Sequence, residues 1–268
     1  MNLDPILRPV IAAMEHGYLP DSLIHAGIRH LLHRRLRAET TGEAAEHQAR
    51  RQAFLASMDA APVAPVPEAA NTQHYEQPPA FFEQVLGPRL KYSSCLWPTG
   101  TSSLAAAEEA ALAETCAHAD LADGARILEL GCGWGSLSLW MAEKYPASRI
   151  TAVSNSRLQR DYIMARAARE GLNNLDVITA DMNDFTTDAR FDRVVSVEMF
   201  EHMRNWRELL IRIHGWLAPD GKLFLHVFCH REQAWEFTVK TSADWMSLHF
   251  FTGGIMPSED LILEVCNP

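Results

Sequence analysis

Cysteine is scarce in this sequence, and its spacing excludes two common ways of stabilising a small fold. The 268 residues include five cysteines, an odd number, and no two of them form a Cys-x-x-Cys pair. A disulfide framework and a cysteine-rich zinc site are therefore not indicated. The histidines show no ligand spacing either, so we expect no bound metal. A reducing compartment, the cytoplasm, is the simpler expectation for such a chain.

Long hydrophobic runs and an excess of positive charge are also missing. No stretch of 18 apolar residues occurs, so we expect no integral membrane association, and the N-terminus lacks a signal pattern. The net charge of −10 argues against nucleic acid or an anionic membrane as the main partner, although it does not exclude a local basic patch. What is present, 47% hydrophobic and 22% charged residues, is typical of a globular protein that buries a core. Nothing in the composition sets the oligomeric state.

Residues 1–70 are predicted to form a helical extension that ends in a linker. Apolar residues recur at helical spacing over residues 21–38, with Asp21 as the expected N-cap, and residues 42–58 predict a second helix. The arginine-rich face of the first helix is interpreted as solvent-exposed, with a lipid or anionic partner as the alternative. Residues 59–69 contain three prolines and predict a semi-rigid connection, because proline interrupts helices and central strands.

The rest of the chain, residues 71–268, is predicted to be one α/β domain. Near-continuous apolar segments separated by helical patterns are typical of a parallel sheet that is covered on both faces. Such sheets bind ligands outside the carboxyl ends of their strands. The five predicted strands are residues 126–130, 149–154, 175–180, 191–197 and 221–228.

The loop after the first predicted strand, ELGCGWGS at residues 129–136, carries glycine at three alternate positions, 131, 133 and 135. Glycine permits unusual backbone angles and lets a ligand approach the backbone closely, and the helix that follows presents free N–H groups. The dinucleotide fingerprint would have a last glycine where Ser136 stands. The loop by itself indicates a bound ligand only weakly, and a tight strand–helix turn without a ligand is the alternative.

A cluster of acidic and histidine residues follows the fourth predicted strand, in SVEMFEHMRNW. It consists of Glu198, Glu201 and His202. Carboxylates attract cations, and an imidazole has a pKa near neutral pH, so the cluster has the residue types of a site that carries chemistry. The alternative interpretation is that Glu201 and His202 simply begin a helix, where the helix dipole favours an acid.

Several separated motifs, in one order, resemble the cyclopropane-fatty-acid synthase superfamily of class I S-adenosylmethionine-dependent methyltransferases. Within it the chain is most similar to the coclaurine-type N-methyltransferases of plant alkaloid pathways. The resemblance implies a Rossmann-like parallel sheet, S-adenosyl-L-methionine as cofactor, and a small-molecule acceptor, an amine or a lipid. The motifs are HYEQPPAFFEQVLGPRLKYSSCLWP, LELGCGWG, VSNSRLQRDYI, SVEMFEHMRNW and DWMSLHFFTGGIMPS.

The resemblance also implies which residues bind the cofactor. Asp181 would accept a hydrogen bond from the adenine amino group. Many class I members carry an acid at the end of the second strand for the ribose hydroxyls; Asn155 and Gln159 are found here, and their amides can still hydrogen-bond a diol. The implied cofactor contacts are Tyr75, Ser93, Glu129, Gly131, Gly133, Asn155, Gln159, Asp181 and Met182.

For the acceptor, the resemblance implies that the cluster of Glu198, Glu201 and His202 holds an ammonium group and removes its proton, with Glu76 assisting. Cyclopropane synthesis on unsaturated lipids is the competing activity. Those synthases usually carry glycine where Glu198 stands and cysteine where Ser94 stands, so the resemblance favours a nitrogen acceptor. His226 keeps a position that the synthases also use.

The resemblance breaks near the end of the chain. Family members continue well beyond GGIMPS and add two further strands, whereas EDLILEVCNP departs from the pattern. We therefore expect a sheet that lacks the last two C-terminal strands. A shortened, inactive methyltransferase-like binding protein is the third hypothesis.

Overall fold

The computed structural model describes residues 4–67, 77–242 and 244–266. The chain divides into two compact units, one of residues 1–60 together with 229–268, and one of residues 61–228. This division differs from the predicted boundary at residue 70, because residues 229–268 group with the N-terminal helices instead of the sheet. Each unit is described by itself below.

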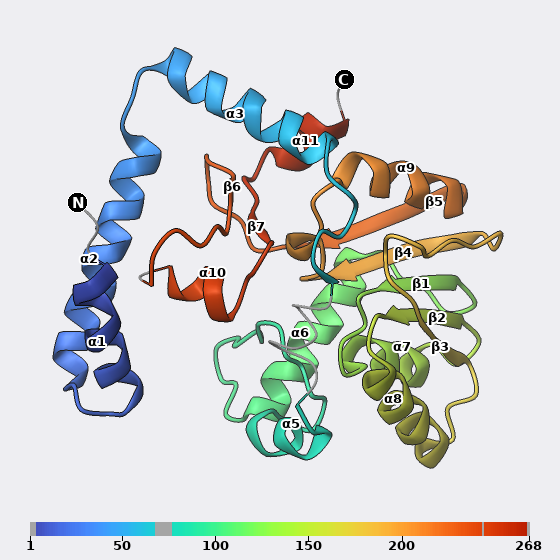
Figure 1. The fold of residues 1–268 in the computed structure, drawn as a ribbon. Coiled ribbons are helices and arrows are strands. Elements are labelled where there is room, and N and C mark those ends of the chain that lie inside the picture. The colour runs from blue at the N-terminus through green and yellow to red at the C-terminus, as the bar shows by residue number, and fades with distance from the viewer. Residues whose placement is uncertain (1–3, 68–76, 243, 267–268) are drawn as a thin grey trace. The chain divides into compact units, whose positions relative to one another are not determined.

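The unit of residues 61–228 contains a five-stranded parallel sheet with the strand order β3-β2-β1-β4-β5 (Figure 1). All five predicted strands are confirmed, and so is the Rossmann-like fold class. The fifth begins earlier than predicted, at Leu217, and ends at His226. The strands are β1 (Arg126–Leu130), β2 (Arg149–Ser154), β3 (Leu175–Thr179), β4 (Phe191–Val197) and β5 (Leu217–His226).

Helices lie between β1 and β2, between β2 and β3, and between β4 and β5, and two further helices of this unit precede β1. Glycines and caps in the sequence set several of their ends: α7 begins after Gly135, α8 begins with Ser156 as its N-cap and ends at Gly171 in a left-handed conformation. The helices are α5 (Pro79–Val85), α6 (Leu104–His118), α7 (Ser136–Lys144), α8 (Arg157–Glu170) and α9 (Trp206–Trp216), with a 3₁₀ turn, η2, at Phe200–His202.

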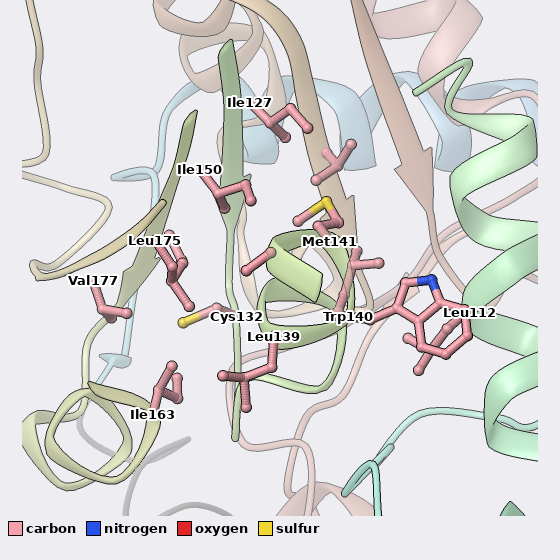
Figure 2. Close-up of a cluster of buried hydrophobic side chains, with 14 of the residues drawn as sticks. Leu112, Ile127, Cys132, Leu139, Trp140, Met141, Ile150, Ile163, Leu175 and Val177 are labelled. Atoms are coloured by element: carbon pink, nitrogen blue, oxygen red, sulfur yellow. The ribbon is translucent and has the colours of Figure 1, made fainter. Parts of the chain in front are cut away.

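The main core lies between the sheet and helices α6, α7 and α8 (Figure 2). Ile127, Ile150 and Val177 project from neighbouring strands toward apolar side chains of these helices, among them Met141 and Ile163. Leu128 and Val194, on the opposite face of the sheet, are also fully buried. Both faces are covered, which explains why the strands read as continuous apolar runs.

The proline-rich segment, predicted as a semi-rigid connection, is bound to the sheet unit through Val63 and Ala64. Val63 and Ala64 are each only 3% exposed. The side chain of Asn183 binds Ala64 in both directions, accepting from its N–H at 2.9 Å and donating to its carbonyl oxygen at 2.8 Å. The Arg204 N–H donates to the Val63 carbonyl oxygen at 2.7 Å. These contacts fix the chain at the carboxyl end of β3.

The other unit is mainly helical and contains a small antiparallel pair of strands. The predicted helices at 21–38 and 42–58 are observed as α2 and α3, but α2 has Pro20 at its N-cap, so the predicted cap Asp21 is already inside the helix. The helix α1 was not predicted. The elements are α1 (Asp4–Glu15), α2 (Asp21–Thr40), α3 (Ala44–Asp59), β6 (Trp235–Glu236), α10 (Trp245–His249), β7 (Ile255–Met256) and α11 (Leu261–Cys266).

Among the described residues, no helix combines the length and the apolar character that crossing a bilayer requires.

Candidate active site

The turn after β1 is built from glycines in the left-handed region. Gly131, Gly133 and Gly135 have φ values of 80°, 51° and 81°, which glycine adopts at little cost. A Cβ at Gly131 would lie 2.5 Å from the Met199 side chain, and one at Gly135 would lie 2.6 Å from Ile163. A Cβ at Gly133 would meet no atom within 4 Å. Two of the glycines therefore serve packing, and Gly133 faces the open space where a ligand could approach the backbone.

Unpartnered buried donors lie beside this loop. The Gln159 side chain is 2% exposed, and its Oε1 accepts a hydrogen bond from the Ser154 hydroxyl at 2.7 Å. Its Nε2 has no partner among the residues that the structure describes, and neither has the Ser136 hydroxyl. Since buried donors normally find a partner, both groups fit the polar atoms of a bound cofactor.

The turn after β3 carries Asp181 and Met182. Asp181 Oδ1 accepts from the Asn183 N–H at 2.8 Å, which fixes the orientation of the carboxylate. Met182 is 7% exposed, and its carbonyl oxygen accepts from Arg212 of α9 at 3.0 Å. Together with Asn155, which follows β2 and donates to the Pro67 carbonyl oxygen at 3.3 Å, these residues lie at the same edge of the sheet as the glycine turn.

Glu129 differs from the other predicted cofactor residues. It is 3% exposed within β1, and its carboxyl group accepts a hydrogen bond from Ser138 of α7. Burial raises the pKa of Glu129 to about 7, and the hydrogen bond from Ser138 opposes that shift. The side chain therefore lies in the interior and joins β1 to α7, the two elements that the glycine turn connects.

The acidic cluster follows β4. Glu198 has a φ of 51°, which is unusual for a residue with a side chain, and its N–H donates to the His226 carbonyl oxygen at 2.8 Å. Glu201 and His202 lie in the 3₁₀ turn η2, and the next α-helix begins only at Trp206, with Asn205 as its side-chain N-cap. Glu201 and His202 thus belong to a short 3₁₀ turn and precede the α-helix instead of beginning it.

The carboxyl group of Glu201 is fully buried, with a side-chain exposure of 0%. Its Oε1 accepts from the Phe228 N–H at 2.8 Å, and its Oε2 has no partner within the described part of the chain. Burial raises the pKa of Glu201 to about 8, and the negative charge of Glu198 adds to the shift. A cation that entered this site would supply the missing partner and favour the ionised carboxylate.

Sequence reasoning missed a buried charged residue near this cluster, Lys91. Its side chain is 5% exposed, and its ammonium group donates to the Ser93 hydroxyl at 2.6 Å. Burial lowers the pKa of Lys91, and the nearby Glu198 carboxylate acts in the opposite direction. Burial likewise lowers the pKa of His226, on which Glu198 and Lys91 have opposite effects. The one signal in the sequence was a lysine inside the apolar and aromatic stretch RLKYSSCLW.

The structure thus gathers most of the predicted site at one edge of the sheet. The turns after β1 and β4 touch, because the Met199 side chain packs on Gly131. Tyr75 and Glu76 lie outside the described residues. Over the residues that the structure describes, no group of three or more His, Cys, Asp or Glu side chains is placed to hold a metal ion.

Comparison with solved structures identifies the class of enzyme. Coclaurine N-methyltransferase bound to N-methylheliamine and SAH is 34% identical, with a TM-score of 0.92 over 98% of this chain and 76% of that chain. A mycolic acid cyclopropane synthase complexed with SAH and CTAB is 25% identical, with a TM-score of 0.62 over 74% of this chain and 73% of that one. SAH is the product that S-adenosylmethionine leaves after methyl transfer. The chain is an S-adenosylmethionine-dependent methyltransferase.

The family within this class follows from the sequence. The profile of the mycolic acid cyclopropane synthetase family matches residues 66–267, and the chain belongs to this family. The (S)-coclaurine N-methyltransferase of Thalictrum flavum subsp. glaucum is 35% identical over 260 residues, which are 96% of this chain and 72% of the relative. The resemblance inferred from the motifs is confirmed.

Proposed function

We propose that this enzyme transfers the methyl group of S-adenosylmethionine to the nitrogen of a small-molecule amine. The observation that carries the proposal is the buried Glu201 carboxyl group, whose Oε2 has no partner among the described residues, beside Glu198 and His202 at the end of β4. Relatives named as N-methyltransferases of coclaurine and of tetrahydroprotoberberine support an amine acceptor.

We assign the cofactor to the turns after β1, β2 and β3. Its methionine portion would lie over Gly133, where the backbone faces open space, and its ribose diol would meet the free amide group of Gln159. Asp181, with Met182 beside it, would hold the adenine. The bound cofactor supplies an electrophilic methyl group on a sulfonium.

The acceptor side must produce a nucleophile. A protonated amine has no lone pair, so a base must take its proton before the nitrogen can attack. Glu198 and Glu201 would attract the ammonium group, and His202 would accept the proton, since imidazole titrates near neutral pH. Holding the nitrogen in line with the methyl group would supply much of the remaining acceleration.

Cyclopropane formation on an unsaturated lipid is the second candidate. The family profile and the resemblance to a cyclopropane synthase support it, and His226 lies next to Glu198 at the acceptor end, where its carbonyl oxygen accepts from the Glu198 N–H. We favour the amine because Glu198 occupies a left-handed backbone position where glycine would be unstrained. A costly side chain at such a position is typical of a functional role.

A methyl-transfer assay tests the proposal. The purified chain would be incubated with S-adenosylmethionine and a panel of secondary and tertiary amines and unsaturated phospholipids, and mass spectrometry would identify the products. Methylated amine is the expected product. A cyclopropane lipid without methylated amine would support the synthase hypothesis, and no transfer to any acceptor would support the inactive binding protein.

We also propose that the enzyme works in the cytoplasm. All five cysteines are free, and two of them are buried, as is usual for a protein of a reducing compartment. Fractionation of cells that express the chain would test this, and recovery from a secreted or luminal fraction would contradict it.

A further inference from the structure

Lys91 is a buried cation that the mechanism above does not use. Lysine is almost never buried without a partner, yet this side chain is 5% exposed. Its Nζ lies 2.6 Å from the Ser93 hydroxyl oxygen, at the short end of the range for a charge-assisted hydrogen bond. The pairing of a buried ammonium with a serine hydroxyl therefore needs an explanation.

The backbone that carries this pair is anchored to α6 by one carboxylate. Glu108 is 0% exposed, and its two oxygens accept from the N–H groups of Arg89 at 2.9 Å and Lys91 at 3.0 Å. Leu90, between them, has a φ of 52°, so the turn is strained and depends on these contacts. A Cβ at Gly87 would lie 2.3 Å from the Glu108 carboxylate, so the chain passes very close to it.

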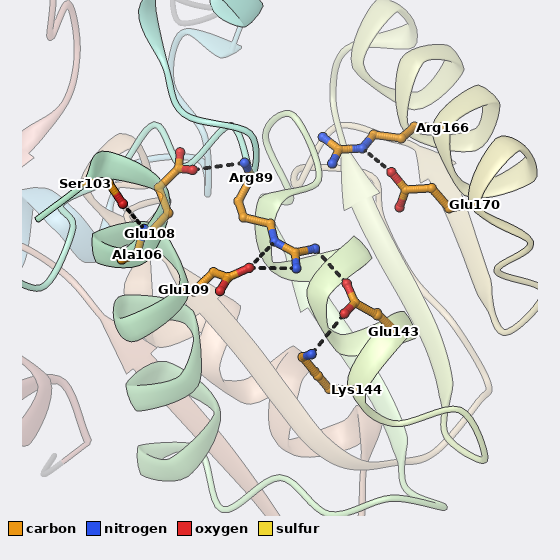
Figure 3. Close-up of polar contacts among 9 residues, drawn as sticks. All are labelled: Arg89, Ser103, Ala106, Glu108, Glu109, Glu143, Lys144, Arg166 and Glu170. Atoms are coloured by element: carbon orange, nitrogen blue, oxygen red, sulfur yellow. Dashed lines mark hydrogen bonds and ion pairs between the residues drawn. The ribbon is translucent and has the colours of Figure 1, made fainter. Parts of the chain in front are cut away.

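The side chain of Arg89 adds a second attachment, as Figure 3 shows. Its guanidinium group pairs with Glu109 of α6 at 2.9 Å and with Glu143 of α7 at 2.6 Å. The turn is thus bound to α6 and to the last turn of α7, the helix that follows the glycine loop. Such anchoring is what a precisely placed binding group requires.

The chemistry of the pair fixes the direction of the serine hydroxyl. An ammonium group can only donate hydrogen bonds, so the Ser93 oxygen must accept from Lys91. The hydroxyl proton of Ser93 is then directed away from Lys91 and is available to an acceptor. The positive charge behind it favours an anionic acceptor, such as the carboxylate of the methionine portion of the cofactor.

We propose that Lys91 is a positioning residue for the cofactor, because it holds the Ser93 hydroxyl as a hydrogen-bond donor toward the cofactor's carboxylate. Glu108 keeps both residues in place. This inference rests on the proposed assignment of Ser93 to the cofactor site, and it makes Lys91 a determinant of cofactor affinity instead of a member of the acceptor site.

A double-mutant cycle measured by calorimetry tests this proposal. S-adenosylmethionine and SAH would be titrated into the wild type, Lys91→Met, Ser93→Ala and the double variant, with the exposed Lys222→Met as the matched control. Each single change is expected to weaken binding about tenfold, the loss typical of one hydrogen bond to a charged group. The double variant should bind about as weakly as Ser93→Ala alone, and the control should bind normally.

Two outcomes would overturn the proposal. If the two losses multiply in the double variant, Lys91 acts independently of Ser93. If Lys91→Met lowers kcat on an amine at saturating cofactor while the cofactor KM stays unchanged, Lys91 acts on the acceptor. Lys91→Arg, which keeps a cationic donor, should lose less affinity than Lys91→Met, and an equal loss would indicate a packing role only. A wild type that binds cofactor but methylates no amine would contradict the proposed function and leave this cycle interpretable.

Discussion

The turns after β1 and β4 follow neighbouring strands, and both use a left-handed backbone conformation, but with different residues. Each places a residue with positive φ directly after its strand, Gly131 at 80° after β1 and Glu198 at 51° after β4. Glycine adopts this conformation freely, whereas a residue with a Cβ loses roughly 1–2 kcal/mol. The turn that we assign to the cofactor therefore has an unstrained backbone, whereas the turn that we assign to the acceptor is strained and presents a carboxylate.

The largest expected effect concerns the base at the acceptor end. His202→Ala should lower turnover on an amine by roughly 10²–10⁴-fold, the usual range for loss of a general base. Cofactor affinity should barely change, because the proposed role of the imidazole is to accept a proton from the amine. Steady-state kinetics with His214→Ala, an exposed histidine of α9, as the control would check this. Wild-type turnover in His202→Ala at neutral pH would remove His202 from the mechanism.

At the cofactor end, Gly133→Val should weaken S-adenosylmethionine binding by about a hundredfold or more, because a side chain would fill the open space above the turn. Gly124→Val is the matched control, since Gly124 also has positive φ, 87°, and open space, but precedes β1 at the opposite edge of the sheet. Calorimetry would measure the cofactor affinity of both variants; backbone strain affects both, whereas only Gly133→Val should exclude the ligand. Equal affinity in both variants would refute this placement of the cofactor.

The buried carboxyl group of Glu201 should make stability depend on pH. Its pKa rises from 4.5 to about 8 on folding, so the folded state binds an additional proton and loses stability as pH rises between these values. Relative to the wild type, the free energy of unfolding of Glu201→Gln should increase by on the order of 1 kcal/mol or more from pH 5 to pH 8. Denaturant unfolding at several pH values would show a widening difference, which the exposed Glu259→Gln should lack. A constant difference would contradict the burial argument.

The smallest effect is the relief of strain after β4. Glu198→Gly should raise the free energy of unfolding by up to about 1 kcal/mol, since the gain from relaxing the turn is partly offset by the greater freedom of glycine in the unfolded chain. Asp220 also has a positive φ, 64°, so Asp220→Gly should raise the free energy of unfolding by a similar amount. Denaturant titrations of both variants would test this, and a loss of stability in Glu198→Gly alone would show that the side chain holds the turn together.

The parts of this site that sequence could predict are those set by local chemistry. The glycine turn was predictable because positive φ at Gly131 and Gly133 is a property of the turn itself. The strands were predictable because burial on both faces leaves a continuous apolar run. The resemblance to a known family then supplied the roles of the residues between them.

Contacts between distant residues decided what sequence reasoning missed. Lys91 is held at the site through Glu108, 17 positions later on another element. The sequence predicts a semi-rigid connection for the proline-rich segment but not its attachment to the sheet unit, because the partner Asn183 stands 119 positions away from Ala64. No local sequence pattern predicts such contacts, since each depends on the packing of the complete sheet unit.

The central claim is that the strained turn after β4 exists to present the Glu198 carboxylate to a cationic amine. The most direct test is the KM for the amine in Glu198→Gly, measured at saturating S-adenosylmethionine beside the Asp220→Gly control. We expect the amine KM to rise about tenfold or more, the loss typical of a hydrogen bond to a charged group, with unchanged cofactor affinity. An unchanged amine KM in Glu198→Gly would contradict the account.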